Sequence, residues 1–353
     1  VYVAPERLVT ERFLALLERS PLALFAIDEA HCVAQWGHDF RPEYLDLGLL
    51  RERFAAVPRL ALTATADPAT RREIHERLLR PDATTFVASF DRPNLLYRVV
   101  DREGGNAQIA AQIESRWRGA SGIVYRRTRD AVEKTAAFLA GRGFDALPYH
   151  AGLDAATRGA NQERFRTGEG VVVVATVAFG MGIDKPDVRF VLHGDLPPSL
   201  EAYYQESGRA GRDGAPADAW LAWGLEDLVL ARKRIEASEA DEARKRVERR
   251  QLDAIVGYCE TTACRREALL RWFGESFAGP CGACDNCLEP VAGWDATEEV
   301  RKALSAAYRT GQRFGAHHLT RVLRGESDER TSRLGHERLS VWGVGAELSD
   351  RQW

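Results

Sequence analysis

The fold class is decided by the stretch L-A-L-F-A-I-D-E-A-H at residues 22–31. Its first six residues, Leu22–Ile27, are apolar and have the length of a strand that is buried on both faces. Continuous apolar runs of this kind are typical of parallel sheets, because helices cover both faces of such a sheet. Asp28 and Glu29 follow at the carboxyl end of this strand, which is where open α/β sheets place their ligands.

Short apolar runs alternate with helical patterns through about residue 225. Four more runs are predicted as buried strands: Leu60–Thr63, Gly122–Tyr125, Val171–Ala175 and Val188–His193. Between them, Pro68–Leu79 is predicted as a helix with Asp67 as its N-cap, and Ala131–Leu139 as a helix that ends before Gly141. The pattern predicts an α/β fold of parallel sheets flanked by helices.

Composition narrows the class of protein. The chain has 353 residues, enough for about two to four domains, and its 45% hydrophobic and 29% charged content is that of a globular protein. No apolar run has the length of a membrane span and no secretory signal is visible, so we expect a cytoplasmic protein without membrane contact. The net charge of −3 gives no general attraction for nucleic acid, so such binding has to rest on local basic surfaces.

The acidic pair is suited to nucleotide hydrolysis. Asp28 can hold Mg²⁺ through water, and Glu29 can orient an attacking water. A plainer interpretation is that the two carboxylates only cap a following helix. The residues Asp28–His31 do not by themselves decide between these interpretations.

An aromatic and basic loop follows directly, at residues 35–44. Trp36, Phe40 and Arg41 suit base stacking and phosphate contact on a single strand, although isolated rings are more often core residues. With this loop the sequence closely resembles motif II and the aromatic-rich loop of the RecQ helicases of superfamily two.

The resemblance continues in order along the chain. The matching segments are Tyr2–Leu8 (motif Ib), Thr63–Ala66 (motif III), Phe90–Asn94 (motif IV), Ala175–Pro186 (motif V) and Gln205–Gly214 (motif VI). The resemblance implies catalytic roles for Asp28, Glu29, His31, Arg209 and Arg212, with Asp28 on the Mg²⁺ that accompanies ATP. It implies that ATP state is coupled to DNA contact by Thr63, Thr65, Asp184 and Gln205. It implies DNA binding by Trp36, His38, Phe40, Arg41, Arg92 and Asn94.

Two arginines in the last of these segments are candidates for the γ-phosphate of ATP. Arg209 and Arg212 are three residues apart, so on a helix both would face the same way. An arginine at the γ-phosphate stabilises the charge that develops in phosphoryl transfer, and we expect Arg212 to do this with Arg209 as its companion. Taken alone, they would more simply be surface arginines on a glycine-rich turn.

Two further segments bear on the resemblance: residues 126–128 depart from the RecQ pattern, whereas residues 149–153 match it. Arg126-Arg127-Thr128 stands where the family often has small or polar residues, and it adds positive charge near the expected DNA side. His150, in the matching segment Tyr149–Leu153, is interpreted as structural.

Cysteines give the second strong signal. Cys281, Cys284 and Cys287 are spaced three residues apart, and Cys264 precedes a helix expected over Arg265–Gly274. Four thiolates with no open position form a closed, structural zinc site, and the spacing resembles the RecQ zinc-binding domain. Cys32 and Cys259 lie outside the pattern and are interpreted as buried thiols.

The last part of the chain resembles the beginning of the RecQ winged helix. Between Arg301 and Arg324 there are six Lys or Arg residues and no acid. This stripe suits duplex phosphates, with Arg301, Lys302 and Arg313 as candidate contacts, although it can also be a solvated basic helix face.

These matches divide the chain into four parts. Residues 1–90 are expected to be the C-terminal part of a first RecA-like lobe, and residues 91–225 a complete second RecA-like lobe. Residues 226–292 are expected to form a helical zinc-binding domain, and residues 293–353 a partial winged helix. The sequence has no G-x-x-x-x-G-K-[ST], the loop that cradles ATP phosphates. We therefore expect a chain truncated at both ends.

The resemblance implies an ATP-dependent DNA helicase that moves 3′ to 5′ in recombination and repair, with structural Zn²⁺ and with Mg²⁺ bound with ATP. Its expected partners are ATP, single-stranded and duplex DNA, and single-stranded-DNA-binding protein, in a cytoplasmic, nucleoid-associated setting. Without the phosphate loop, the chain is expected to be inactive alone. One alternative is an ATP-inactive DNA-binding paralogue. A DEAH-type RNA helicase is a weaker alternative, because that group lacks a four-cysteine module followed by a winged helix.

Overall fold

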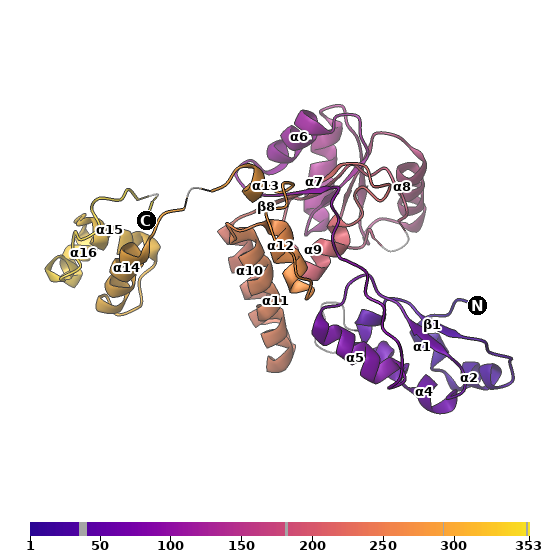
Figure 1. Ribbon diagram of the computed structural model, residues 1–353. Helices are drawn as coiled ribbons and strands as arrows, with labels where there is room; N and C mark the ends of the chain where they lie inside the picture. The colour runs from indigo at the N-terminus through magenta and orange to yellow at the C-terminus, as the bar shows by residue number, and fades with distance from the viewer. Residues whose placement is uncertain (35–40, 181–182, 292, 351) are drawn as a thin grey trace. The chain divides into compact units, whose positions relative to one another are not determined.

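The computed structural model describes residues 1–34, 41–180, 183–291, 293–350 and 352–353. It divides into two compact units, Val1–Pro290 and Val291–Trp353 (Figure 1). The first unit holds both sheets of the described chain, and the second is helical. No helix among the described residues is both long and apolar enough to cross a lipid bilayer.

The N-terminal sheet has two parallel strands, β1 (Phe25–Ile27) and β2 (Arg59–Ala61). Both are shorter than the apolar runs that predicted them, because each strand pairs only with the other and the ladder ends where that pairing ends. Leu24, Leu60 and Leu62 remain 44–49% exposed. Parts of these apolar runs are therefore left exposed in the described structure.

Short helices pack around this small sheet. They are α1 (Pro5–Leu8), α2 (Glu11–Glu18), the 3-10 helix η1 (Ala30–Val33), α3 (Pro42–Asp46), α4 (Leu49–Arg53) and α5 (Pro68–Leu78). Leu14, Val33, Leu50 and Leu78 are buried in their common core. The N-cap of α5 is confirmed, since the Asp67 carboxylate accepts a hydrogen bond of 2.7 Å from the Thr70 amide.

The second sheet has six parallel strands in the order β3-β8-β7-β4-β6-β5. The strands are β3 (Leu95–Asp101), β4 (Gly122–Tyr125), β5 (Asp145–Tyr149), β6 (Val171–Ala175), β7 (Phe190–His193) and β8 (Ala217–Trp223). Every residue of the four central strands is buried, as the apolar runs predict for β4, β6 and β7, whereas β8 was not among the predicted strands. The α/β class of parallel sheets flanked by helices is therefore confirmed.

Helices cover both faces of this sheet (Figure 1). On one face, Val124 of β4 packs with α6 (Gly105–Arg116) and α7 (Arg129–Ala140). On the other face, the adjacent Ile123 belongs to the core that includes α8 (Ala155–Thr167) and α9 (Leu200–Ser207). Successive residues of a strand thus supply two different cores, which explains why the run carries no alternation of polarity.

The part expected to be helical, residues 226–292, begins with a hairpin of α10 (Leu225–Ala237) and α11 (Glu242–Glu260), followed by α12 (Arg265–Trp272) and α13 (Asp285–Leu288). The loop before α13 lies against β3, an edge strand of the sheet. The Tyr97 amide donates to the Ala283 carbonyl (3.3 Å), and the Val99 amide donates to the Asp285 carboxylate (2.8 Å). This contact covers a strand edge that would otherwise offer its amides to other chains.

The second unit consists of α14 (Thr297–Arg309), α15 (Ala316–Arg324), α16 (Glu329–Leu334) and the 3-10 helix η2 (His336–Arg338). Its core is small and contains Ala306, Val322, Leu323 and Val341. His318 and His336 are also buried there, with 2.9 Å between His318 Nε2 and His336 Nδ1.

Packing between β4 and β7 gives a test of the six-stranded sheet. A Cβ added to Gly122 would lie 2.1 Å from the ring of Phe190, the residue opposite it in β7. We expect Gly122→Ala to lower the free energy of unfolding by about 1–3 kcal/mol through overpacking, measured by denaturant titration. The control is Gly159→Ala, in open space on helix α8, which should be neutral or stabilising. Equal stability of the two variants would contradict this packing.

Candidate functional site

The acidic pair lies at the carboxyl end of β1, as predicted. The Glu29 amide donates to Asp28 Oδ1 (2.9 Å), and the Tyr44 hydroxyl donates to the Asp28 carbonyl (3.2 Å). Burial raises the pKa of Tyr44 to about 12, so its hydroxyl remains a donor. Glu29 has a φ of 49°, a left-handed conformation that a non-glycine residue rarely adopts without a structural cause.

His31 joins this segment to the one after β2. The imidazole is buried, with its Nδ1 2.9 Å from Thr63 Oγ1 and 3.4 Å from Glu29 Oε2. Thr63 also accepts a hydrogen bond from the Thr65 amide (3.2 Å). The Thr65 hydroxyl is buried and has no hydrogen-bond partner among the described residues. Four of the residues singled out from the sequence, Glu29, His31, Thr63 and Thr65, therefore form one connected group.

The aromatic loop is largely outside the described residues. Trp36, His38 and Phe40 all fall in the undescribed segment 35–40. Arg41, the first described residue after it, donates to Glu6 Oε1 (3.3 Å) and lies 5.9 Å from the ring centroid of Tyr44.

The two candidate arginines do not lie on a helix, which corrects the expected geometry. Helix α9 ends at Ser207, so Arg209 and Arg212 lie on the turn that follows it. The turn contains Gly211 with a φ of 58°, a conformation that ends a helix and suits glycine. The two side chains nevertheless reach the same segment, because both donate to residues between Gly180 and Asp184.

Of the two arginines, Arg212 is the one whose present partner is easier to replace with another anion. Its guanidinium donates to the Ile183 carbonyl (2.9 Å) and to the Asp184 carboxylate (3.2 Å), and the Asp184 side chain is 88% exposed. Exposed ion pairs contribute little to stability, so this one can be exchanged for another anion at low cost. Gln205, on α9, is half-buried.

Arg92 and Asn94 are both engaged by this turn. Arg92 donates to the carbonyls of Gly208, Ala210 and Gly211, and Asn94 donates to those of Gly211 and Ala215. The sequence offered no signal for this contact, because more than 110 positions separate the partners.

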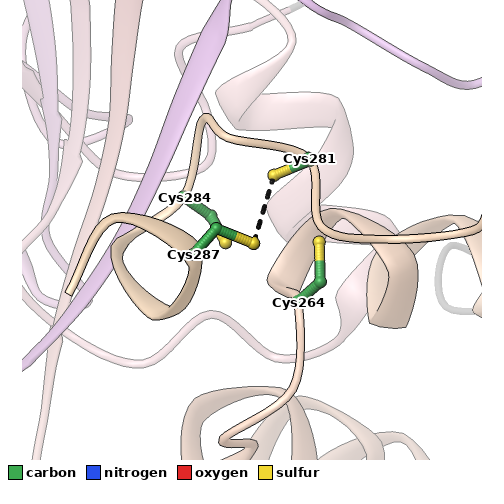
Figure 2. Close-up of side chains that lie close together, drawn as sticks. All are labelled: Cys264, Cys281, Cys284 and Cys287. Carbon is green, nitrogen blue, oxygen red and sulfur yellow. Dashed lines mark hydrogen bonds between the residues drawn. The ribbon is translucent and has the colours of Figure 1, made fainter. Parts of the chain in front are cut away.

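The four predicted cysteines come together (Figure 2). Cys264 lies at the N-cap of α12 and Cys284 at the N-cap of α13, while Cys281 and Cys287 lie on either side of Cys284 in sequence. All four Sγ atoms lie within 4.8 Å of one another, and the Cys281 and Cys287 sulfurs are 3.9 Å apart. Sulfurs bound tetrahedrally to zinc are about 3.8 Å apart, so the donor set and its size fit structural Zn²⁺.

Neighbouring residues hold the cysteine loop in place. Asn286 donates to the carbonyls of Thr261 (2.6 Å) and Ala263 (2.8 Å), just before Cys264. Arg265 pairs with Asp285, which also accepts from β3. Cys259 is buried outside the cluster, as expected, and burial raises the pKa of its thiol.

Three family models match the chain. They are the helicase conserved C-terminal domain over residues 106–214, the RecQ zinc-binding domain over residues 225–288 and the RQC domain over residues 290–353. The ATP-dependent DNA helicase RecQ of Pasteurella multocida is 44% identical over 353 residues, which are 100% of this chain and 56% of that protein. This chain belongs to the RecQ helicase family.

Other bacterial RecQ helicases show the same extent of similarity. The protein of Haemophilus influenzae is 43% identical over 100% of this chain and 57% of its own length. That of Bacillus subtilis is 39% identical over 97% of this chain and 58% of its own length. The chain thus spans somewhat more than half the length of these relatives.

A cavity of about 610 Å³ in this RecQ chain was not predicted from the sequence. It lies between the carboxyl ends of β4, β6 and β7 and the hairpin of α10 and α11, and Arg126, Arg127 and Asp195 line it. Asp195 lies 3.0 Å from Arg126 Nε and accepts from the Arg127 amide (2.9 Å). One signal in the sequence pointed here, the departure from the RecQ pattern at residues 126–128.

The basic stripe of the second unit, which the RQC domain model matches, is partly neutralised. Arg301 pairs with Glu298, Lys302 with Glu347, Arg321 with Asp328, and Arg324 with Glu326. Arg309 and Arg313 have no acidic partner among the described residues, and the Arg313 guanidinium lies 5.5 Å from the Phe314 ring centroid.

The cysteine cluster predicts one tightly bound Zn²⁺ per chain. Elemental analysis after dialysis should find it, and a Cys281→Ser and Cys284→Ser double variant should lose it, whereas Cys259→Ala should keep it. Metal binding is part of the folding free energy of such a module, so chelation should also unfold the part between α12 and α13. Zinc retained by the double variant, or missing from the unaltered chain, would contradict this assignment.

Proposed function

We propose that this chain supplies part of an ATP-dependent DNA helicase that translocates 3′ to 5′ along one strand and unwinds duplexes in recombination and repair. The observation that carries the proposal is the group of Asp28, Glu29, His31 and Thr63 at the carboxyl ends of β1 and β2. The RecQ relatives named above are ATP-dependent DNA helicases, which supports the same activity. A nucleoid-associated location and contact with single-stranded-DNA-binding protein belong to this proposal.

The acidic group would act on ATP with Mg²⁺. Asp28, exposed at the end of β1, would hold the ion through water, and Glu29 would orient the attacking water. When bound, Mg²⁺ neutralises negative charge on the phosphates. The contact of His31 with both Glu29 and Thr63 gives the segment after β2 a direct connection to the catalytic carboxylate, which supports a coupling role for Thr63 and Thr65.

Arg209 and Arg212 would address the γ-phosphate. Arg212 is the better candidate, because its present acidic partner, Asp184, is largely exposed and a phosphate is a stronger bidentate acceptor for a guanidinium. Gln205 lies on α9 just before the turn that carries both arginines, which supports its coupling role.

Hydrolysis also needs backbone amides and a lysine around the β- and γ-phosphates. The 353 residues contain no G-x-x-x-x-G-K-[ST]. We therefore propose that these residues alone do not hydrolyse ATP, and that hydrolysis requires a protein which also carries this loop.

DNA contact would involve three surfaces of the chain. The first is the aromatic loop with Trp36, His38, Phe40 and Arg41. The second is the cavity at the carboxyl ends of β4, β6 and β7, where Arg126 and Arg127 are already paired with Asp195 and Asp227 and would have to exchange these partners for phosphate. The third is the winged-helix unit, where Arg309 and Arg313 keep charges without acidic partners among the described residues, while Arg301 and Lys302 are already paired.

Glu29→Gln tests the catalytic assignment in a form of the protein that carries the phosphate loop. Loss of the water-orienting carboxylate should lower DNA-stimulated ATP turnover by about 10²–10⁴-fold, with ATP and DNA affinity nearly unchanged. Glu52→Gln, on the exposed face of α4, is the matched control and should turn over normally. Turnover near the unaltered rate in Glu29→Gln would show that Glu29 has another role.

Duplex binding by the winged-helix unit should depend on which arginines lack partners. We expect Arg313→Ala to weaken binding to duplexes of different sequence about equally and to reduce the salt slope by about 1, because a phosphate contact is lost. Arg301→Ala should weaken binding less, since Glu298 already neutralises that charge. Fluorescence anisotropy across a salt series measures both variants. A larger effect of Arg301→Ala would contradict this assignment.

A further inference from the structure

Residues 91–94, which lie in the chain between the two sheets, contact the turn of residues 208–215 that carries Arg209 and Arg212. This turn is called the arginine turn below. Arg92 Nη1 donates to the Gly208 carbonyl (2.9 Å), and Arg92 Nη2 donates to the carbonyls of Ala210 (2.9 Å) and Gly211 (3.0 Å). A planar guanidinium therefore holds three carbonyls that lie on both sides of Arg209 in the chain. These carbonyls follow the end of α9, and that of Gly211 also accepts from the Gly214 amide (3.0 Å).

Asn94 holds the other side of the same turn. Its amide nitrogen donates to the carbonyls of Gly211 and Ala215, both at 2.8 Å, so Arg212 lies between two fixed points. A Cβ on Gly211 would lie 2.4 Å from this nitrogen, which shows how closely the two segments approach. The backbone that carries both arginines is thus fixed from outside by two side chains.

The zinc module in turn holds the segment that carries Arg92. Arg266, two residues after Cys264, is only 3% exposed, pairs with Asp91 and donates to the Leu95 carbonyl (2.8 Å). A buried arginine is stable only with such partners, so Asp91 and Arg266 depend on each other. The contacts run without a gap from the cysteine cluster to Asp91, and from the adjacent Arg92 to the turn.

We propose that Arg92 is a positioning residue for Arg209 and Arg212, and that the Asp91–Arg266 pair connects its position to the zinc module. The structure thereby gives the zinc module a role in the geometry of the γ-phosphate arginines, although its cysteines offer no group to ATP. This rests on the proposed function for its consequence in hydrolysis, but its structural part stands on the contacts alone. Lysine cannot replace Arg92, because one ammonium cannot span the three carbonyls with the geometry of a guanidinium.

Hydrogen exchange in the zinc-loaded 353-residue chain tests the structural part. In Arg92→Lys, amides in residues 208–214 should exchange about tenfold faster, while those of β6 remain unchanged. Asp91→Asn should raise exchange at the same turn, and the effect of the double variant should be smaller than the sum of the two single effects. Arg98→Lys is the matched control, because Arg98 contacts only Glu289 among the charged residues described and should leave the turn unchanged.

The second measurement is ATP turnover in a form that carries the phosphate loop. Arg92→Lys should lower kcat at least tenfold with KM for ATP within about threefold, the split expected when an interaction acts in the transition state. If Arg92→Lys left exchange at the arginine turn unchanged, or also made exchange faster throughout β6, the positioning role would be overturned. An unchanged turn in Asp91→Asn would overturn the connection to the zinc module. If Arg92→Lys made exchange faster only at the arginine turn and left kcat unchanged, the positioning role would be supported. The proposed role of the two arginines in hydrolysis would then be contradicted.

Discussion

Parallel strands present their carboxyl ends at the same edge of a sheet, and the candidate site depends on this constraint. Asp28 and Glu29 follow β1, and Thr63 follows β2, so His31 can contact both segments. In the six-stranded sheet the same rule brings the segments after β4, β6 and β7 together around one cavity. Strands that are buried on both faces leave only their ends for chemistry, which explains why the candidate residues lie in the turns that follow strands.

The cysteine module, whose four thiols fit a structural metal, also covers an edge of the second sheet. Its loop covers the outer edge of β3 through the Tyr97 and Val99 amides, and Arg266 fixes the segment just before that strand. Arg92 lies in that segment, so the module that covers the edge of β3 also holds the residue that contacts the arginine turn. A structural metal bound there would therefore support the segment before β3 as well as its own loop.

Local signals in the sequence predicted local features well. The continuous apolar runs gave β4 and β6 with their observed bounds, Asp67 caps α5, and the three-residue spacing of the cysteines anticipated the cluster. Features that depend on distant contacts were missed. Strand β5 was missed because it lacks a continuous apolar run and contains Pro148, which an edge strand tolerates. Arg209 and Arg212 were expected on a helix, and the structure instead places them on the glycine-rich turn that was the alternative. The pairing of Lys302 with Glu347 spans 45 positions.

The central proposal is that this RecQ chain carries the acidic group and the γ-phosphate arginines of an ATP-dependent helicase, and that neither can act without a phosphate cradle. Phosphate release by the 353-residue chain with Mg²⁺, ATP and excess single-stranded DNA tests this most directly. The account predicts no release above the rate without protein, because Asp28, Glu29, Arg209 and Arg212 cannot replace backbone amides and a lysine around the phosphates. Turnover at a rate typical of helicases, abolished by Glu29→Gln, would contradict it.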